Sequence, residues 1–84
     1  MERSFLLPLL RVPAGMPAIV RAIDAEDAVR GRLHALGFTL GARVEVCPAC
    51  GNKGGRRIRL RGASLVLDEA VAERVLCSPV SQAF

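Results

Sequence analysis

Apolar and charged residues alternate at two places in the middle of the chain. Val44 and Val46 alternate with charged residues, and Ile58 and Leu60 alternate with arginines. Successive side chains of a strand point to opposite faces, so a period of two is typical of a strand that buries one face. The pattern therefore predicts two strands with these four apolar side chains directed inward and the arginines directed outward.

Three further strands are predicted from short apolar runs bounded by turn residues. The first covers 18–23 and follows a glycine and a proline, which give a turn its backbone freedom and its fixed φ. Another begins after the turn at Gly62 and directs Leu65 and Leu67 inward. A closing strand covers 75–77, so the chain is predicted to be mostly β.

Two helical segments are predicted to interrupt the strands. Asp24 is the expected N-cap of the first helix and Gly37 its left-handed end. A second, short helical segment covers 69–74 and begins after an N-cap at Asp68. Apolar residues recur at helical spacing in the first helix, and one face of it is expected to pack inward. These residues are Ala25, Ala28, Val29, Leu33 and Leu36.

The number and length of these elements indicate the fold class. Short, mostly antiparallel strands with two small helical pieces cannot form a parallel crossover architecture in 84 residues, but they can wrap into a small barrel. We therefore predict a mostly β protein with one or two short helices, folded as a small SH3-like β-barrel. One domain is expected to span 1–84, with a core over about 9–77 and a frayed tail at 78–84.

The net charge, the amino-terminal apolar run and the cysteine count indicate the kind of partner and the cellular compartment. Twelve basic and eight acidic residues give a formal net charge of +4, which favours an anionic partner. The apolar run at the amino terminus is not typical of a secretory signal, because it is short, contains Pro8 and stops at Arg11. No stretch approaches the roughly 20 apolar residues that cross a bilayer. Three cysteines are an odd number for a disulfide framework. We therefore expect a cytoplasmic protein without membrane insertion.

Several segments share their order and spacing with a known family. In the first half they are Gly15, Ala18, Val20 and Ile23, then Arg32-Leu33-His34-Ala35-Leu36-Gly37, then Gly41-Ala42-Arg43-Val44-Glu45-Val46. In the second half they are Ile58-Arg59-Leu60-Arg61-Gly62, Leu65-Val66-Leu67, Ala72 and Val75. Over about 9–77 the chain resembles the FeoA family of ferrous iron transport accessory proteins.

The resemblance carries its own expectations. It implies an SH3-like barrel that works in the cytosol beside FeoB, a membrane ferrous iron transporter with a GTPase domain, and that has no catalysis of its own. Two departures from the family pattern stand out. Leu67 is followed by Asp68, where the family usually has a basic residue. The stretch Cys47-Pro48-Ala49-Cys50-Gly51 is not part of the general family pattern.

Cys47 and Cys50 are the candidate metal ligands. Two thiolates three positions apart, with a proline between them and a glycine after them, make half of a zinc-knuckle or rubredoxin-like site for zinc or iron. A closed site needs four ligands, and a symmetric homodimer would supply the other two. Cys77 is expected to be a buried structural thiol and His34 to lie on the polar helix face. Redox chemistry and a turn without chemical duty are the alternatives for the pair.

The arginines on the predicted outer strand face are the candidate partner-binding residues. They are Arg43, Arg57, Arg59 and Arg61, with Arg56 beside them. One interpretation is a docking surface for an acidic partner, and another is a solvated face that prevents edge pairing. Nucleic-acid binding is disfavoured, because the chain has no Trp or Tyr and only three phenylalanines for base stacking, of which Phe38 is expected in the core.

The sequence contains little that indicates an enzyme. The one histidine has no evident nucleophilic partner, and no glycine-rich loop joins a strand to a helix as a phosphate site requires. We therefore expect a non-enzymatic accessory protein of ferrous iron uptake that docks on the GTPase-bearing part of FeoB. The alternative is a basic SH3-like domain that binds nucleic acid or belongs to a metal-dependent regulator, with the Cys47/Cys50 metal site.

Overall fold

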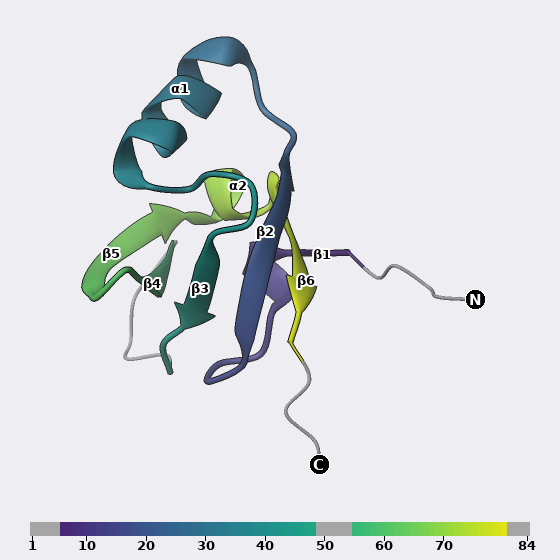
Figure 1. The fold of residues 1–84 in the computed structure, drawn as a ribbon, viewed down its shortest axis with the longest axis vertical. Coiled ribbons are helices and arrows are strands. Elements are labelled where there is room, and N and C mark those ends of the chain that lie inside the picture. The colour runs from purple at the N-terminus through teal and green to yellow at the C-terminus, as the bar shows by residue number, and fades with distance from the viewer. Residues whose placement is uncertain (1–5, 49–54, 81–84) are drawn as a thin grey trace.

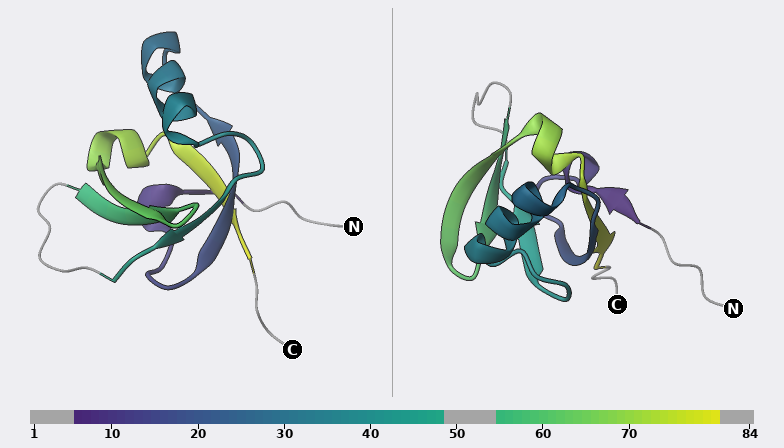
Figure 2. Two further views of the ribbon diagram at one scale, coloured as in Figure 1. Left: turned by 60° about the vertical axis from the view of Figure 1, so that its left-hand side comes forward. Right: turned by 90° about the horizontal axis from the view of Figure 1, so that it is seen from above.

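A computed structural model of the chain describes residues 6–48 and 55–80. In these residues six strands form one antiparallel sheet in the order β1-β6-β2-β3-β4-β5, and the sheet curls around one core (Figure 1 and Figure 2). The elements are β1 (Leu7–Pro8), a 3₁₀ turn (Leu9–Arg11), β2 (Pro17–Ile23), α1 (Asp27–Leu36), β3 (Arg43–Val46), β4 (Gly55–Leu60), β5 (Ala63–Asp68), α2 (Glu69–Ala72) and β6 (Val75–Pro79). The predicted architecture, mostly β with two short helices, is confirmed.

The predicted inward residues of β3 and β4 form the centre of the core. Val44, Val46, Ile58 and Leu60 are each at most 3% exposed, and Phe38 is fully buried as expected. Val44 pairs in register with Leu60, and Val46 pairs with Ile58. Burying one aliphatic side chain of this size contributes roughly 1.5–3 kcal/mol relative to leaving it in water. The alternation along these two strands therefore both selects the strand conformation and supplies much of the core.

The amino-terminal segment contributes more to the barrel than the sequence predicted. Leu9 and Val12 are fully buried, and β1 pairs with β6 through Leu7 and Cys77. The predicted strands began only at 18–23, because a strand of two residues is too short to show alternation. The 3₁₀ turn that follows β1 directs Leu9 into the core, so this segment is part of the barrel.

Arg56 corrects the predicted set of outward arginines. It lies two positions before Ile58 in β4 and therefore on the same, inward side of the strand. Its guanidinium donates hydrogen bonds to the carbonyl oxygen of Leu10 and, at 3.3 Å, to that of Val12. These carbonyls lie at the end of the 3₁₀ turn, where backbone acceptors lack partners within the helix. Arg56 thus joins β4 to the amino-terminal segment and is not part of the outer face.

The first helix begins later than predicted and ends where predicted. α1 starts at Asp27 with Glu26 at the N-cap position, so Asp24 is not the N-cap. The backbone N–H of Asp24 donates to the carbonyl oxygen of Arg74 at 2.8 Å. Gly37 closes the helix with φ of 108°, and its N–H donates to the carbonyl oxygen of His34 at 3.0 Å. This left-handed conformation strains residues with a Cβ, which explains the glycine.

The apolar face of α1 is only partly covered. Leu33 is buried and Val29 is half-buried, whereas Ala28 and Leu36 are exposed, so the prediction of one inward face was wrong for two of its five residues. The helix lies beyond one end of the barrel, above α2 and β5 (Figure 1 and Figure 2). A helix at the end of a barrel contacts it over a short length, and the spacing of its apolar residues cannot reveal how many of them the barrel reaches.

The turn between β4 and β5 and the ends of the last elements differ slightly from prediction. Arg61 and Gly62 form a two-residue hairpin turn with φ of 54° and 83°, so Arg61 is a turn residue and not a strand residue. In β5, Leu67 is buried as expected and Leu65 is half-buried. The helix α2 stops at Ala72, and β6 continues to Pro79, which is further than the predicted strand at 75–77.

Candidate docking surface and cysteine pair

Three of the predicted partner-binding arginines lie on the outer face of neighbouring strands. Arg57 and Arg59 point outward from β4, Arg43 points outward from β3, and all three are exposed. Strand register places Glu45 directly opposite Arg59. It places Val66 of β5 directly opposite Arg57. The outer face of β3, β4 and β5 therefore presents cations beside one carboxylate and one exposed apolar side chain.

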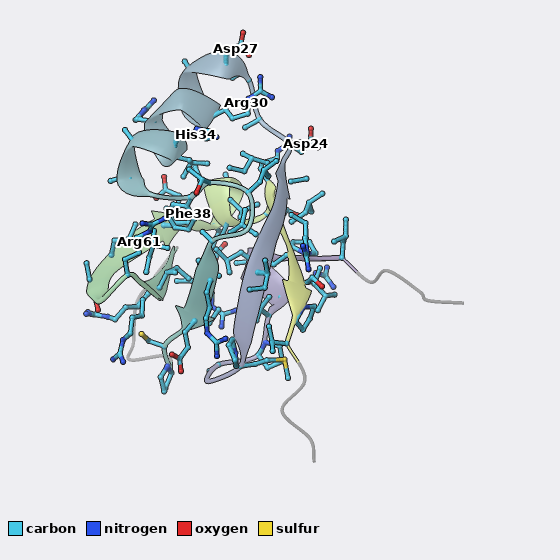
Figure 3. The ribbon with its side chains drawn as sticks, in the orientation of Figure 1. Asp24, Asp27, Arg30, His34, Phe38 and Arg61 are labelled. Carbon is cyan, nitrogen blue, oxygen red and sulfur yellow. The ribbon has the colours of Figure 1, made fainter. Side chains whose placement is uncertain are left out.

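Arg61 joins this face from the hairpin turn. A hollow of about 160 Å³ over β3 and β4 is lined by Arg43, Arg59 and Arg61, with Glu45 at its side. Arg61 lies beside the base of α1 (Figure 3), and its Nε atom is 3.8 Å from the position that a Cβ on Gly37 would take. A left-handed backbone costs a residue with a Cβ on the order of 1–2 kcal/mol. The fold thus holds an arginine where glycine or asparagine would be less strained.

The four outer arginines have no partners within the described part of the chain. Neither a hydrogen bond nor an ion pair of their guanidinium groups occurs there, and Glu45 forms no ion pair with Arg59 despite the register. The two ion pairs of residues 6–48 and 55–80 lie near the helices, and they are Arg30–Asp27 at 2.6 Å and Arg74–Asp24 at 3.5 Å. Unpaired arginines keep all their donors for carboxylates or phosphates of a partner.

The outer arginines and most described carboxylates lie on different elements, and Arg30, Arg32 and Arg74 are the cations that stand among these carboxylates. The outer arginines stand on β3, on β4 and in the turn after it, whereas most described carboxylates lie beside α1 and α2. These are Asp24, Glu26, Asp27, Asp68, Glu69 and Glu73. Separation of this kind creates a positive field over one face, which steers an acidic partner toward it.

Cys47 lies directly after β3 and is partly exposed. Its backbone N–H donates to the carbonyl oxygen of Arg57 at 2.9 Å, which fixes it at the end of the β3–β4 ladder. Cys50, the other predicted ligand, lies outside the described residues. A partly exposed thiol at a strand end suits a surface metal site. Within the described ranges, no three His, Cys, Asp or Glu side chains gather as a metal-ligating group.

Neither of the remaining candidate ligands reaches Cys47. Cys77 is fully buried in β6, and desolvation raises the pKa of its thiol to about 11, so it is neutral at physiological pH. This agrees with the predicted structural role of Cys77. His34 is exposed on α1 (Figure 3), whereas β3 runs away from α1 and ends at the far side of the barrel (Figure 1). Within the described residues, a four-ligand site at this pair would therefore need ligands from outside the chain, and a second copy is the source expected from the sequence.

A metal at the cysteine pair is expected to bind as one ion per two chains and to drive dimerisation. Two thiolates from each protomer would complete a tetrahedral set for zinc or iron. Replacing Cys47 or Cys50 by serine should abolish both metal and dimer and leave the barrel folded. The matched control, Cys77→Ser, should lower stability without changing the metal content, because this side chain is in the core. Elemental analysis and light scattering on reduced protein measure both effects, and a metal-free monomer would contradict the expectation.

The described residues were also considered as possible membrane-spanning segments. No helix within 6–48 and 55–80 is long and apolar enough to span a bilayer.

A family model matches the sequence over all of the described strands and helices. The model of the FeoA domain matches residues 7–79. The chain belongs to the FeoA domain family. No match was found among curated proteins. The matched residues run from β1 to the end of β6, so family membership covers every element described above.

Solved FeoA structures share the architecture. A crystal structure of the iron uptake regulatory protein FeoA superimposes with a TM-score of 0.81 at 25% identity, covering 90% of this chain and 100% of that one. The solution structure of FeoA from Chlorobium tepidum gives a TM-score of 0.80 at 28% identity, covering 89% of this chain and 71% of that one. The predicted SH3-like barrel is confirmed by these matches.

The same fold occurs inside larger regulators. A manganese-dependent transcriptional repressor matches with a TM-score of 0.81 at 17% identity, and the match covers 95% of this chain but only 45% of the repressor. At this identity the likeness concerns the fold alone. The SH3-like barrel is therefore a scaffold that proteins of different function share. The fold alone does not distinguish an accessory protein of iron transport from a domain of a regulator, so the distinction depends on the family match.

Proposed function

We propose that this protein acts in the cytoplasm beside the FeoB ferrous iron transporter and docks on the GTPase-bearing part of that transporter. The observation that carries the proposal is the FeoA domain match over residues 7–79, which includes the whole described barrel. The FeoA domain is a non-catalytic accessory domain of ferrous iron transport. Its contribution to transport is therefore expected to come from contact with another protein and not from chemistry at a site of its own.

The surface that suits this contact is the outer face of β3 and β4. Arg43, Arg59 and Arg61 converge on one hollow, and Arg57 continues the face toward β5. None of these guanidinium groups is committed to a partner within the described residues. An acidic patch on the partner would therefore gain bidentate contacts without first breaking internal ones.

The alternative is a nucleic-acid-binding or metal-regulator domain, since a manganese-dependent transcriptional repressor contains a barrel of the same fold. Phe38 is the only Phe, Tyr or Trp in the described part of the chain and is fully buried, so no exposed side chain of these three types offers a stacking platform there. Arginines on strands without aromatics between them suit carboxylates of a protein better than unstacked bases.

The proposal is tested by measuring binding of the purified chain to the purified cytoplasmic part of FeoB. We expect saturable binding that persists at physiological salt, because protein interfaces combine charged and apolar contacts. Single-stranded and duplex DNA and RNA serve as comparison ligands. Binding to nucleic acid that falls steeply with salt, together with no binding to FeoB, would replace the proposal by the alternative.

A further inference from the structure

The hollow on the outer face of β3 and β4 concentrates positive charge. Arg43, Arg59 and Arg61 line it, and Glu45 is the one carboxylate among its lining residues, so its net charge is +2. Strand register places Glu45 opposite Arg59, and the same register continued by one residue places Arg61 opposite Arg43. Like charges at opposite positions of neighbouring strands repel each other. The arrangement is therefore unfavourable until an anion neutralises it.

The charges of the hollow have no partners within the described residues. In 6–48 and 55–80, hydrogen bonds of arginine side chains come from Arg30 and Arg56, and ion pairs come from Arg30 and Arg74. Glu45 forms no ion pair with Arg59, although the two are opposite each other in the sheet. The donors of three guanidinium groups and the acceptor oxygens of one carboxylate therefore stay available to a ligand.

The hairpin turn keeps an arginine at a position where the backbone disfavours one. Arg61 has φ of 54° in the two-residue turn, a conformation that glycine and asparagine adopt with less strain. Its Nε atom lies 3.8 Å from the position that a Cβ on Gly37 would take, so the end of α1 holds its side chain beside the hollow (Figure 3). Strained residues of this kind cluster at ligand-binding sites. The guanidinium of Arg61 is therefore expected to serve a ligand in the hollow.

The size of the hollow suits a small anion. Its volume is about 160 Å³, compared with roughly 30 Å³ for one water molecule in the liquid. A tetrahedral oxyanion such as phosphate or sulfate fits a space of this size, and guanidinium groups bind such oxyanions through two parallel hydrogen bonds. A nucleotide base would extend onto a surface that offers no exposed Phe, Tyr or Trp within the described ranges. The hollow therefore favours a tetrahedral anion without an attached base.

Glu45 distinguishes between the tetrahedral anions. A carboxylate only accepts hydrogen bonds, so it repels an anion that has no proton to donate. Hydrogenphosphate keeps one proton at neutral pH, whereas sulfate has none. A phosphate monoester is largely deprotonated at neutral pH, because its second pKa is about 6. Inorganic phosphate is therefore the dianion that can accept hydrogen bonds from the arginines and also donate one to Glu45.

We propose that the hollow between Arg43, Arg59 and Arg61 is a binding site for inorganic phosphate in its hydrogenphosphate form. The three guanidinium groups donate to the phosphate oxygens, and the P–OH group donates to the Glu45 carboxylate. The two negative charges of the anion match the net charge of the hollow. The site goes beyond the proposed function, because phosphate binding needs no second protein. Only the source of the phosphate rests on the proposed function, under which the GTPase domain of FeoB releases phosphate when it hydrolyses GTP.

Titration of the purified chain, followed by the NMR shifts of its backbone amides, tests the site without FeoB. The ligands are sodium phosphate, sodium sulfate and glycerol phosphate at one ionic strength and neutral pH. The variants of the hollow are Arg59→Gln, Arg61→Asn and Glu45→Gln. The matched control is Arg57→Gln, because Arg57 is exposed on the same face of β4 and does not line the hollow. Thermal melts check folding, and Arg61→Asn should melt at a higher temperature than the parent, because asparagine tolerates the left-handed turn.

We expect the parent to bind phosphate about tenfold or more tightly than sulfate or glycerol phosphate, because only phosphate donates a charge-assisted hydrogen bond to Glu45. Arg59→Gln and Arg61→Asn should weaken phosphate binding by about tenfold or more, and Arg57→Gln should change it by less than about twofold. Glu45→Gln should remove the preference for phosphate over sulfate. Sulfate or glycerol phosphate bound as tightly as phosphate by the parent would overturn the proposal. Equal weakening by Arg57→Gln and Arg59→Gln would also overturn it, since the effect would then belong to the whole face and not to the hollow.

Discussion

Replacing Leu60 by aspartate is expected to unfold the domain. Leu60 is 3% exposed and pairs across the sheet with Val44 and Ala63. Its Cδ2 atom also lies 3.2 Å from the position that a Cβ on Gly37 would take, so it packs against the end of α1 as well as inside the barrel. A carboxylate there would be buried without a partner, which costs several kcal/mol.

The cost of burying this carboxylate is comparable with the whole free energy of unfolding. Small domains are stabilised by only about 5–15 kcal/mol, and a domain of this size lies near the lower end. Circular dichroism should show loss of the cooperative melting transition at room temperature and above. Arg59→Asp is the matched control, since Arg59 is the preceding residue of β4 and points to solvent. A near-normal melt for Leu60→Asp would mean that the assigned facing of β4 is wrong.

The parts of the fold that the sequence predicted are those in which one short period repeats. Alternation around Val44 and Ile58 identifies two strands and their buried faces, because one face of a strand is either covered or solvated along its whole length. Gly37 was equally predictable, since a left-handed helix end favours one residue type. These local signals did not need knowledge of the tertiary arrangement.

The parts that the sequence missed depend on contacts between distant segments. β1 has two residues and is defined by its pairing with β6, so no local pattern identifies it. The helix α1 shows an apolar stripe, but only the position of the helix at the end of the barrel determines that Leu36 stays exposed. Arg56 was within reach of the sequence, because its parity with Ile58 places it inward, and its hydrogen bonds to the 3₁₀ turn give the physical reason for an arginine there.

The candidate docking surface was likewise predictable from the sequence only in part. Strand parity predicted that Arg43, Arg57 and Arg59 share the outer face, and the structure places all three there. It did not predict that Arg61 reaches the same hollow from a left-handed turn, or that Glu45 lies opposite Arg59. A groove of about 280 Å³ between α1 and β5 was also not predictable, because its two walls are about 30 residues apart along the chain.

Reversing the charge of Arg57 and Arg59 is expected to abolish capture of the cytoplasmic part of FeoB and leave the domain folded. Both side chains are exposed on β4 and have no internal partner among the described residues, so the substitution removes no contact that stabilises the barrel. Like charges placed against an acidic partner cost several kcal/mol, which corresponds to a loss of at least about a hundredfold in affinity.

The control for this reversal is the pair Arg11→Glu and Arg21→Glu, which changes the net charge by the same amount on exposed residues away from the outer face of β4. A general effect of net charge would weaken binding equally in both double variants, whereas a defined docking surface weakens it only in the Arg57 and Arg59 variant. Repeating the measurement at several salt concentrations separates steering from contact, since steering is screened beyond about 10 Å at 0.1 M salt and close pairs are screened much less. Capture that survives reversal of Arg57 and Arg59 at moderate salt would remove the arginine face from the interface.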